Sequence, residues 1–254
     1  MKILPSTTLP SKAPFSRSHS PRPAEHKGGY RVYRDCLRWE FGFTCALCLL
    51  HEADLEEYGV DVSRSAKTWI EHIVPQSDDP DKVNVYENCL YACCYCNRAR
   101  STKPTQDEKG NRLLDPTSSA WAEHFDAVDD KLVPKTGDGE YTRICYELND
   151  ELKVLMRGNR RTQIEKLNKQ LREYPAEIEQ DVVLAKYLSA SNDPRHLEAA
   201  EALFRAVVEL EEKIQIARTA LERYRGIPNH HPTVCRCRRE LKLPPQLADQ
   251  LIEV

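Results

Sequence analysis

Two pairs of cysteines in this chain have the spacing of a metal site. Each pair follows the pattern C-x-x-C, and the four residues are Cys45, Cys48, Cys93 and Cys96. Four thiolates on two tight turns are the ligand set of a tetrahedral structural zinc site. Three further cysteines lie near these pairs and leave other combinations open: Cys36, Cys89 and Cys94. We favour the two matched pairs and expect them to bind one zinc ion, which would stabilise a domain with a small apolar core.

A second set of polar residues lies around these cysteines. Glu71 and His72 are neighbours between the two pairs, Asn88 precedes the second pair, and Asn97 directly follows Cys96. Side chains alternate along a strand, so Glu71 and His72 would face opposite sides unless a bulge turns both toward one site. A zinc ion bound by Cys96 would fix Asn97 at the start of a helix, facing that strand. The spacing therefore predicts a polar site beside the zinc site.

The segments that carry these residues are predicted to form a small α+β module. Aromatic and apolar residues at helical spacing predict a short helix between about residues 30 and 41. Residues 67–74 are rich in β-branched and aromatic types and stop at Pro75, which predicts a strand. Residues 88–91 could form the second strand, and residues 93–101 complete the second cysteine pair and begin a helix.

Beyond about residue 160 the chain is predicted to form a helical hairpin. The first helix has an apolar face until Pro175 interrupts or kinks it. Asn192-Asp193-Pro194 predicts the turn, and Ile227-Pro228 ends the second helix. That helix has apolar residues at alternating spacings of four and three, which form a heptad stripe. The stripe consists of Leu203, Val207, Leu210, Ile214, Ala217, Leu221 and Tyr224.

These patterns divide the chain into four parts. Residues 1–28 are rich in proline, serine and basic residues and are predicted to be a flexible tail. Residues 29–158 hold the metal-binding module, residues 159–226 form the hairpin and a candidate partner-binding surface, and residues 227–254 form a second tail. A second metal site could form in residues 227–254, although the spacing of its candidate ligands fits no strong template. These ligands are His230, His231, Cys235 and Cys237.

The composition indicates the cellular location of the protein but does not indicate whether it binds nucleic acid. The 254 residues include ten cysteines, and the first residues lack the apolar core of a signal peptide. No apolar run approaches the ~20 residues that span a bilayer, so we expect no membrane association and a cytoplasmic location. In a reducing compartment, clustered cysteines indicate metal ligands before disulfides. The net charge of −3 argues neither for nor against nucleic acid.

The order of the motifs resembles the HNH endonuclease superfamily with its ββα-metal fold. The order is C-x-x-C, Glu-His-Ile-Val-Pro, Asn-Cys-Leu and then C-x-x-C-Asn. Residues 37–45, 114–116, 124–125 and 148–149, with Arg157, continue the likeness, which covers about residues 30 to 160. The layout is also similar to that of defence-associated HNH nucleases, including Septu-type and retron-linked ones. The resemblance makes residues 29–158 an HNH nuclease domain.

The resemblance also implies roles for single residues. His72 would be the general base, and Glu71 would ligate a catalytic metal where many relatives have aspartate. Asn97 would be the second ligand of that metal, and Asn88 would brace the loop and the His72 ring. Oxygen ligands suit Mg²⁺ or Mn²⁺, and a histidine near its reference pKa of about 6.5 can accept a proton from water at neutral pH.

Phosphate contacts are expected from basic residues on the predicted helix after Asn97. These are Arg98, Arg100 and Lys103, and a second strip could consist of Arg31, Arg34 and Arg38. We therefore expect a DNA endonuclease, and the defence-type layout points to the effector of an antiphage system. A regulatory partner, such as an ATPase, would restrain it through the hairpin. Two alternatives stay open, namely a zinc-stabilised binding module without cleavage and a nuclease directed at RNA.

Overall fold

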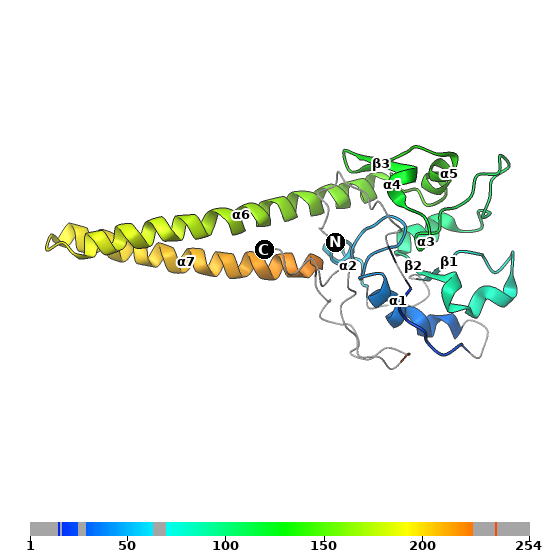
Figure 1. Cartoon of the computed structure of the whole chain (residues 1–254), viewed down its shortest axis with the longest axis horizontal. Helices are drawn as coiled ribbons and strands as arrows, with labels where there is room; N and C mark the ends of the chain where they lie inside the picture. The colour runs from blue at the N-terminus through cyan, green and yellow to red at the C-terminus, as the bar shows by residue number, and fades with distance from the viewer. Residues whose placement is uncertain (1–14, 16, 25–28, 63–69, 226–236, 238–254) are drawn as a thin grey trace. The chain divides into compact units, whose positions relative to one another are not determined.

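The computed structural model describes residues 15, 17–24, 29–62, 70–225 and 237 (Figure 1). The chain divides into two compact units. One unit comprises Met1–Arg160 with Arg225–Val254, and the other comprises Arg161–Tyr224. The helical hairpin therefore forms a unit separate from the motif-bearing part of the chain.

The first described helices of this unit lie at the predicted place. The 3-10 helix η1 (Gly29–Tyr33) continues into α1 (Arg34–Glu40), and α2 (Glu52–Glu57) follows. Tyr33 and Leu37 are fully buried, as their helical spacing requires of residues on one apolar face. The first cysteine pair lies between α1 and α2, in the turn after Phe43, which has a positive φ of 55°.

Two short strands and a helix follow in the predicted order. β1 (Ile70–His72) pairs antiparallel with β2 (Cys89–Tyr91), and α3 (Cys94–Arg100) comes next. The 3-10 helices η3 (Pro80–Asn84) and η4 (Tyr86–Asn88) connect the strands. Part of the strand predicted for residues 67–74 lies outside the described residues, and the described part ends at His72 rather than at Pro75.

A second hairpin and a helix complete this unit. α4 (Trp121–His124) leads into β3 (Phe125–Val128), which pairs with β4 (Lys131–Pro134), and α5 (Gly137–Cys145) follows. Trp121 and Phe125 stack with ring centroids 5.0 Å apart and are almost completely buried. They join the apolar core that also contains the cysteine pairs.

A buried ion pair links α1 to α2. Arg38 donates from Nε to Glu52 Oε1 at 2.7 Å and from Nη2 to Oε2 at 2.6 Å. The Tyr91 hydroxyl of β2 also donates to Glu52 Oε1. Arg38 and Glu52 are 1% and 0% exposed, so neither charge is hydrated. The two parallel hydrogen bonds between them take the place of the lost water contacts.

Part of the segment predicted to be a flexible tail is packed instead. Phe15 is buried, and its ring centroid lies 4.7 Å from that of Phe41. Arg17 forms a 3.0 Å ion pair with the buried carboxylate of Glu40. Phe41 and Glu40 thus hold Phe15 and Arg17 in place. The proline-rich composition of the segment does not indicate these contacts.

The second unit is the predicted helical hairpin. α6 (Glu151–Ser189) starts before residue 160, and α7 (Pro194–Arg225) runs back beside it (Figure 1). Asp193 caps α7 by accepting a hydrogen bond from the Arg195 backbone N–H at 2.9 Å. Apolar residues on facing sides are buried: Ile164, Ala185, Ala200, Val207, Leu210, Ile214, Ala217 and Leu221. The side chain of Tyr224, the last residue of the predicted stripe, lies outside the described part.

Pro175 does not interrupt the first helix, contrary to one expectation from the sequence. α6 continues through it from Glu151 to Ser189. Proline removes one backbone hydrogen bond and crowds the preceding turn, yet the helix runs on past it for fourteen residues to Ser189. Within the described residues, no helix combines the length and the apolar character needed to cross a bilayer.

Candidate functional site

The two cysteine pairs come together in the geometry of a metal site. The Sγ atoms of Cys45, Cys48, Cys93 and Cys96 all lie within 4.8 Å of one another, and all four residues are buried. The Sγ atoms of Cys48 and Cys93 are 3.6 Å apart. A tetrahedral zinc site with Zn–S bonds of about 2.3 Å has sulfur–sulfur edges of about 3.8 Å. The donor set and its spacing therefore fit zinc.

Backbone hydrogen bonds hold both turns in place. The Cys45 N–H donates to Leu50 O at 2.8 Å, and Ala46 N–H donates to Tyr91 O of β2 at 2.8 Å. Leu49 adopts a positive φ of 61° to close the first turn. In the second turn, Cys93 caps α3 and its Sγ accepts from the Cys96 N–H at 3.5 Å. The first turn is thus tied to the strand that leads into the second.

Three thiols of the cluster, those of Cys45, Cys93 and Cys96, have strongly shifted pKa values. Burial raises the pKa of Cys93 and of Cys96 well above the usual value. Burial acts in the same direction on Cys45, but hydrogen bonds from the three neighbouring thiols outweigh it and lower its pKa. Metal binding requires deprotonated thiols, so one thiol of the cluster is prepared to ionise and the metal must displace the other protons.

Two buried cations at the start of α6 compensate the charge of this cluster. Lys153 is 2% exposed, and its ammonium group donates to Tyr146 O at 2.7 Å and to Glu147 O at 3.0 Å. Burial lowers the pKa of Lys153, but the four nearby cysteines raise it more. Arg157 is also buried, and its Nε donates to Asp130 O at 2.7 Å. A zinc ion with four thiolates carries a net negative charge, which these cations offset.

Glu71 and Asn97 lie along the contact between β1 and α3. Asn97 Nδ2 donates to Ile70 O of β1 at 2.8 Å, which leaves the amide oxygen Oδ1 as an acceptor or metal ligand. Glu71 Oε1 lies 3.9 Å from Nε of Arg100, which is three residues after Asn97 and on the same side of α3. Burial raises the pKa of Glu71 to about 8, while Arg100 opposes this shift. This carboxyl group therefore ionises readily only beside positive charge.

His72 lies at the end of β1 among residues of the loop and of η1. Its Nε2 is 3.0 Å from Val83 O, and its ring meets the Tyr30 ring edge-on with centroids 4.7 Å apart. A proton on Nε2 satisfies the carbonyl oxygen and leaves Nδ1 as the proton acceptor. Burial lowers the pKa of His72, although the Val83 carbonyl opposes this. The imidazole is therefore held in the neutral form that can accept a proton.

Asn88 connects both ends of the loop that supports His72. Its Oδ1 accepts from Val74 N–H at 2.8 Å, and its Nδ2 donates to Val74 O at 2.9 Å and to Lys82 O at 3.1 Å. Val83 follows Lys82 directly and presents its carbonyl to the His72 ring. One amide side chain thus fixes the loop from which the imidazole is positioned.

The strand register separates Glu71 from His72. Ile70, Glu71 and His72 pair in unbroken order with Tyr91, Leu90 and Cys89, so no bulge occurs there. Adjacent side chains consequently leave opposite faces of β1. Among the described residues, the clusters of at least three histidine, cysteine or acidic ligands include neither Glu71 nor His72. Glu71 and Asn97 as ligands of a catalytic ion therefore stay a prediction.

Most of the basic residues expected to contact phosphate form hydrogen bonds or ion pairs within the protein instead. Arg98 is exposed, but Arg100 is only 2% exposed and faces Glu71. Lys103 Nζ donates to Ala99 O at 2.6 Å and to Cys145 O at 3.0 Å. In the second strip, Arg34 donates to Val62 O and Arg38 pairs with Glu52, whereas Arg31 is exposed. Carbonyl and carboxylate acceptors that the fold brings near these side chains explain this difference.

Arg100 combines burial with unsatisfied donors. Among the described residues, its Nε and Nη2 atoms have no hydrogen-bond partner. Buried donors without acceptors are rare in folded proteins, and their presence indicates an oxygen-bearing ligand or ordered water. Arg100 is therefore part of the polar site beside β1, although the sequence suggested a surface role for it.

Comparison with known families identifies the motif-bearing segment. Residues 45–103 match the family model of the HNH endonuclease. The matched segment, called the HNH segment below, contains β1, β2 and α3, with all four cysteines and the polar residues of the candidate site. It supports the HNH superfamily without distinguishing a defence-associated branch. Comparison with curated proteins found no match, and neither did comparison with solved structures.

Proposed function

We propose that this protein is a metal-dependent endonuclease that hydrolyses phosphodiester bonds in DNA. The proposal is supported by the HNH segment, in which the Asn97 amide of α3 donates to Ile70 O of β1 and Glu71 of β1 lies 3.9 Å from Arg100 of α3. In this proposal both residues ligate Mg²⁺ or Mn²⁺, His72 is the general base, and Asn88 positions it. The four-cysteine zinc site holds α3 against the strands.

The chemistry follows from what each group can do. A bound Mg²⁺ or Mn²⁺ would supply positive charge to the scissile phosphate and to the oxygen that leaves it. Glu71 and Asn97 offer the hard oxygen ligands that such ions prefer. Arg100 keeps positive charge beside the Glu71 carboxylate, and its unsatisfied donors are available to an oxygen ligand. The protein thus concentrates charge where an anionic substrate must bind.

His72 would take the proton from the attacking water. Its Nε2 is held by Val83 O, so Nδ1 accepts the proton as the water oxygen bonds to phosphorus. The bond between phosphorus and the 3′ oxygen breaks, and this departing oxygen takes a proton from solvent. The expected products carry a 5′ phosphate and a 3′ hydroxyl, as the family resemblance implies. Because His72 leaves β1 on the face opposite Glu71, water and substrate must bridge the end of the strand.

The test is cleavage by matched histidine variants. Purified protein is incubated with plasmid, linear duplex DNA and transfer RNA, with Mg²⁺, with Mn²⁺ or with a chelator. We expect His72→Ala to lose about 10²–10⁴-fold in cleavage rate while its zinc content and fold are retained. His196→Ala is the control, since His196 is exposed on α7 in the other unit. Undiminished activity in His72→Ala would reject the mechanism, and cleavage of RNA alone would reject DNA as the substrate.

A non-catalytic zinc module is the second candidate. The strand register favours it, because it sends the Glu71 and His72 side chains to opposite faces of β1 and not toward one shared site. Such a module would bind nucleic acid or protein equally well with Ala or His at position 72. The same cleavage assay, with a parallel binding measurement, distinguishes this candidate from the nuclease.

We also propose that the helical hairpin binds a regulatory protein. Its exposed apolar side chains support this, since Val183, Tyr187 and Ile216 are 65%, 76% and 68% exposed. An antiphage role and an ATPase as the partner remain predictions from the resemblance. Full activity of the isolated chain on plasmid, unchanged by any co-expressed partner, would count against restraint.

A further inference from the structure

We propose that His19, Cys36 and Cys237 form a second zinc site, separate from the four-cysteine site. The three ligand atoms lie within 4.8 Å of one another, although the residues come from three remote parts of the chain. Cys36 is on α1 and is buried, whereas His19 and Cys237 are half-buried. The proposal does not depend on nuclease activity.

The distances are those of one coordination sphere. Cys36 Sγ and Cys237 Sγ are 4.0 Å apart, and Cys237 Sγ is 3.4 Å from His19 Nδ1. With Zn–S bonds of about 2.3 Å and Zn–N bonds of about 2.0–2.1 Å, a tetrahedron has S–S edges of about 3.8 Å and S–N edges of about 3.6 Å. Both separations lie close to these edges, and the two sulfur atoms are much too far apart for a disulfide, whose bond is about 2.05 Å.

The backbone of His19 is held by a carboxylate on α1, the helix that carries Cys36. Glu40 lies four residues after Cys36, so both side chains project from one side of α1. Glu40 Oε1 accepts from the backbone N–H groups of Ser18 and His19 at 2.5 Å and 2.9 Å. Its Oε2 accepts from the Tyr86 hydroxyl at 2.9 Å, which fixes the carboxylate itself. The backbone of His19 is therefore positioned independently of any metal.

The chemistry of the donors favours a thiophilic divalent ion. Two thiolates and one neutral imidazole balance the charge of Zn²⁺ and match its preference for sulfur and nitrogen. Among the described residues, three side chains supply ligands for this site, one fewer than the four of a tetrahedral zinc site. Mg²⁺ and Mn²⁺ prefer oxygen donors, so the proposed catalytic ion would not compete for this site.

The site would join distant segments to the HNH segment. Cys237 lies 201 residues after Cys36, so one ion closes a long loop. The segment that carries His19 also holds β2, because Arg17 Nη2 donates to Glu87 O at 3.0 Å and to Cys89 O at 2.7 Å. Cys89 is the partner of His72 in the strand register. Metal at this site would thus stabilise the strand next to the proposed general base.

Zinc counting on the full chain tests the proposal. We expect two equivalents of zinc per chain in the unaltered protein. His19→Gln and Cys237→Ser should each lose one equivalent, because both change a half-buried ligand without removing a buried side chain of α1. Cys94→Ser is the matched control, since Cys94 is a half-buried cysteine outside both clusters, and it should keep two. Cobalt loading gives a second readout, in which both ligand variants lose part of the thiolate-to-cobalt absorption.

Three results would overturn the proposal. One is a single zinc equivalent in the unaltered protein. Another is two equivalents in both His19→Gln and Cys237→Ser. The third is a Cys36–Cys237 disulfide in protein purified under reducing conditions, seen as a mass two hydrogens lower with both thiols resistant to alkylation. Circular dichroism of each variant confirms that the zinc count is taken on folded protein.

Discussion

The two units of this protein are stabilised by different physics. The unit with the HNH segment has strands of three or four residues, a four-cysteine cluster, and buried charges such as Arg38 and Glu52. The hairpin unit consists of two long helices joined by one stripe of buried apolar residues, among them Val207, Leu210 and Ile214. One depends on a few specific interactions, and the other on many similar ones.

This difference matters for function because chemistry needs fixed positions. A pair of three-residue strands is too short to hold Glu71 and His72 by sheet hydrogen bonds alone. A bound metal and buried ion pairs fix the positions of side chains more precisely. The stabilisation that each gives is mostly lost when one ligand or one charged partner is removed. An apolar stripe is less specific, and it loses stability gradually as single side chains are shortened.

Breaking the zinc site should produce the largest effect. Cys93→Ser should remove most of a metal-binding free energy of about 10–16 kcal/mol, which unfolds β1, β2 and α3. The hairpin has its own apolar contacts and should keep its helices. Hydrogen exchange measured by mass spectrometry would show fast exchange in peptides covering residues 70–100 and slow exchange in residues 200–221.

Cys94→Ser is the control for this comparison. Cys94 lies next to Cys93 but outside the cluster, so its substitution should leave zinc content and exchange unchanged. If Cys93→Ser accelerated exchange equally in both units, they would share one folding transition and the comparison between them would fail.

The buried ion pair should give the next largest effect. Arg38→Ala leaves the Glu52 carboxylate buried beside the Tyr91 hydroxyl without its cation, which should cost about 3–5 kcal/mol of unfolding free energy. Urea denaturation followed by tryptophan fluorescence reports this unit, since Trp39 and Trp121 are both buried in it.

A double variant separates the two explanations of this cost. Arg38→Met with Glu52→Leu removes both charges and keeps apolar volume, so it should recover much of the lost stability. A double variant no more stable than Arg38→Ala would show that the Arg38 side chain acts through packing rather than charge.

Shortening the apolar stripe should have a smaller and local effect. Leu210 is 7% exposed, and Leu210→Ala should cost about 2–4 kcal/mol in the hairpin. Val208, two residues earlier, is 54% exposed, and Val208→Ala should change stability by less than about 0.5 kcal/mol. Thermal unfolding followed by helical circular dichroism measures both, and equal losses in the two variants would contradict the buried stripe.

The same division separates what the sequence predicted well from what it missed. The cysteine pairs and the turn at residues 192–194 are local patterns. Residues only a few positions apart determine each of them, so the spacing alone predicts them. The hairpin follows from periodicity over many residues, so single exceptions such as Pro175 do not change it. The family comparison supports the HNH segment on the same local motifs.

Interactions between remote residues were not readable from the sequence. Arg100 and Lys103 follow Asn97 as surface-type residues would, yet Glu71 and the Cys145 carbonyl engage them inside the protein. Whether a basic side chain faces solvent depends on acceptors that only the fold brings near. Cys237 shows the same limit, because among the described residues its ligand neighbours are His19 and Cys36, which lie far from it in the sequence. His230, His231 and Cys235, which the sequence suggested as its partners, lie outside the described residues.

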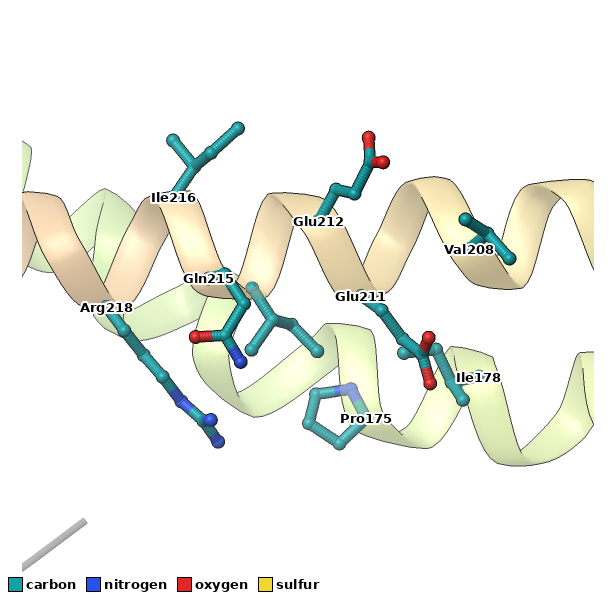
Figure 2. Close-up of a pocket in the computed structure, with 9 residues that line it drawn as sticks. Pro175, Ile178, Val208, Glu211, Glu212, Gln215, Ile216 and Arg218 are labelled. Carbon is teal, nitrogen blue, oxygen red and sulfur yellow. The ribbon is translucent and has the colours of Figure 1, made fainter.

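Removing the helix-breaking residue should have the smallest effect, and it should be stabilising. Pro175 lies inside α6 and lines a groove with Ile178, Val208 and Gln215 (Figure 2). Proline costs about 3 kcal/mol relative to alanine in a helix interior, and loss of its ring contacts offsets part of that gain. Pro175→Ala should therefore raise the unfolding free energy of the hairpin by about 1–2 kcal/mol.

The control for this last change is Glu177→Ala, an exposed position on the same turn of α6 that should shift stability by less than about 0.5 kcal/mol. Zinc content and hydrogen exchange in residues 70–100 should be identical in both variants, because the gain is confined to one unit. A lower melting temperature in Pro175→Ala would show instead that the proline ring fills the groove of Figure 2 in a way that the hairpin needs. The apolar stripe would then depend on a specific contact, as the zinc-bearing unit does, and the contrast between the two units would be smaller than their structures suggest.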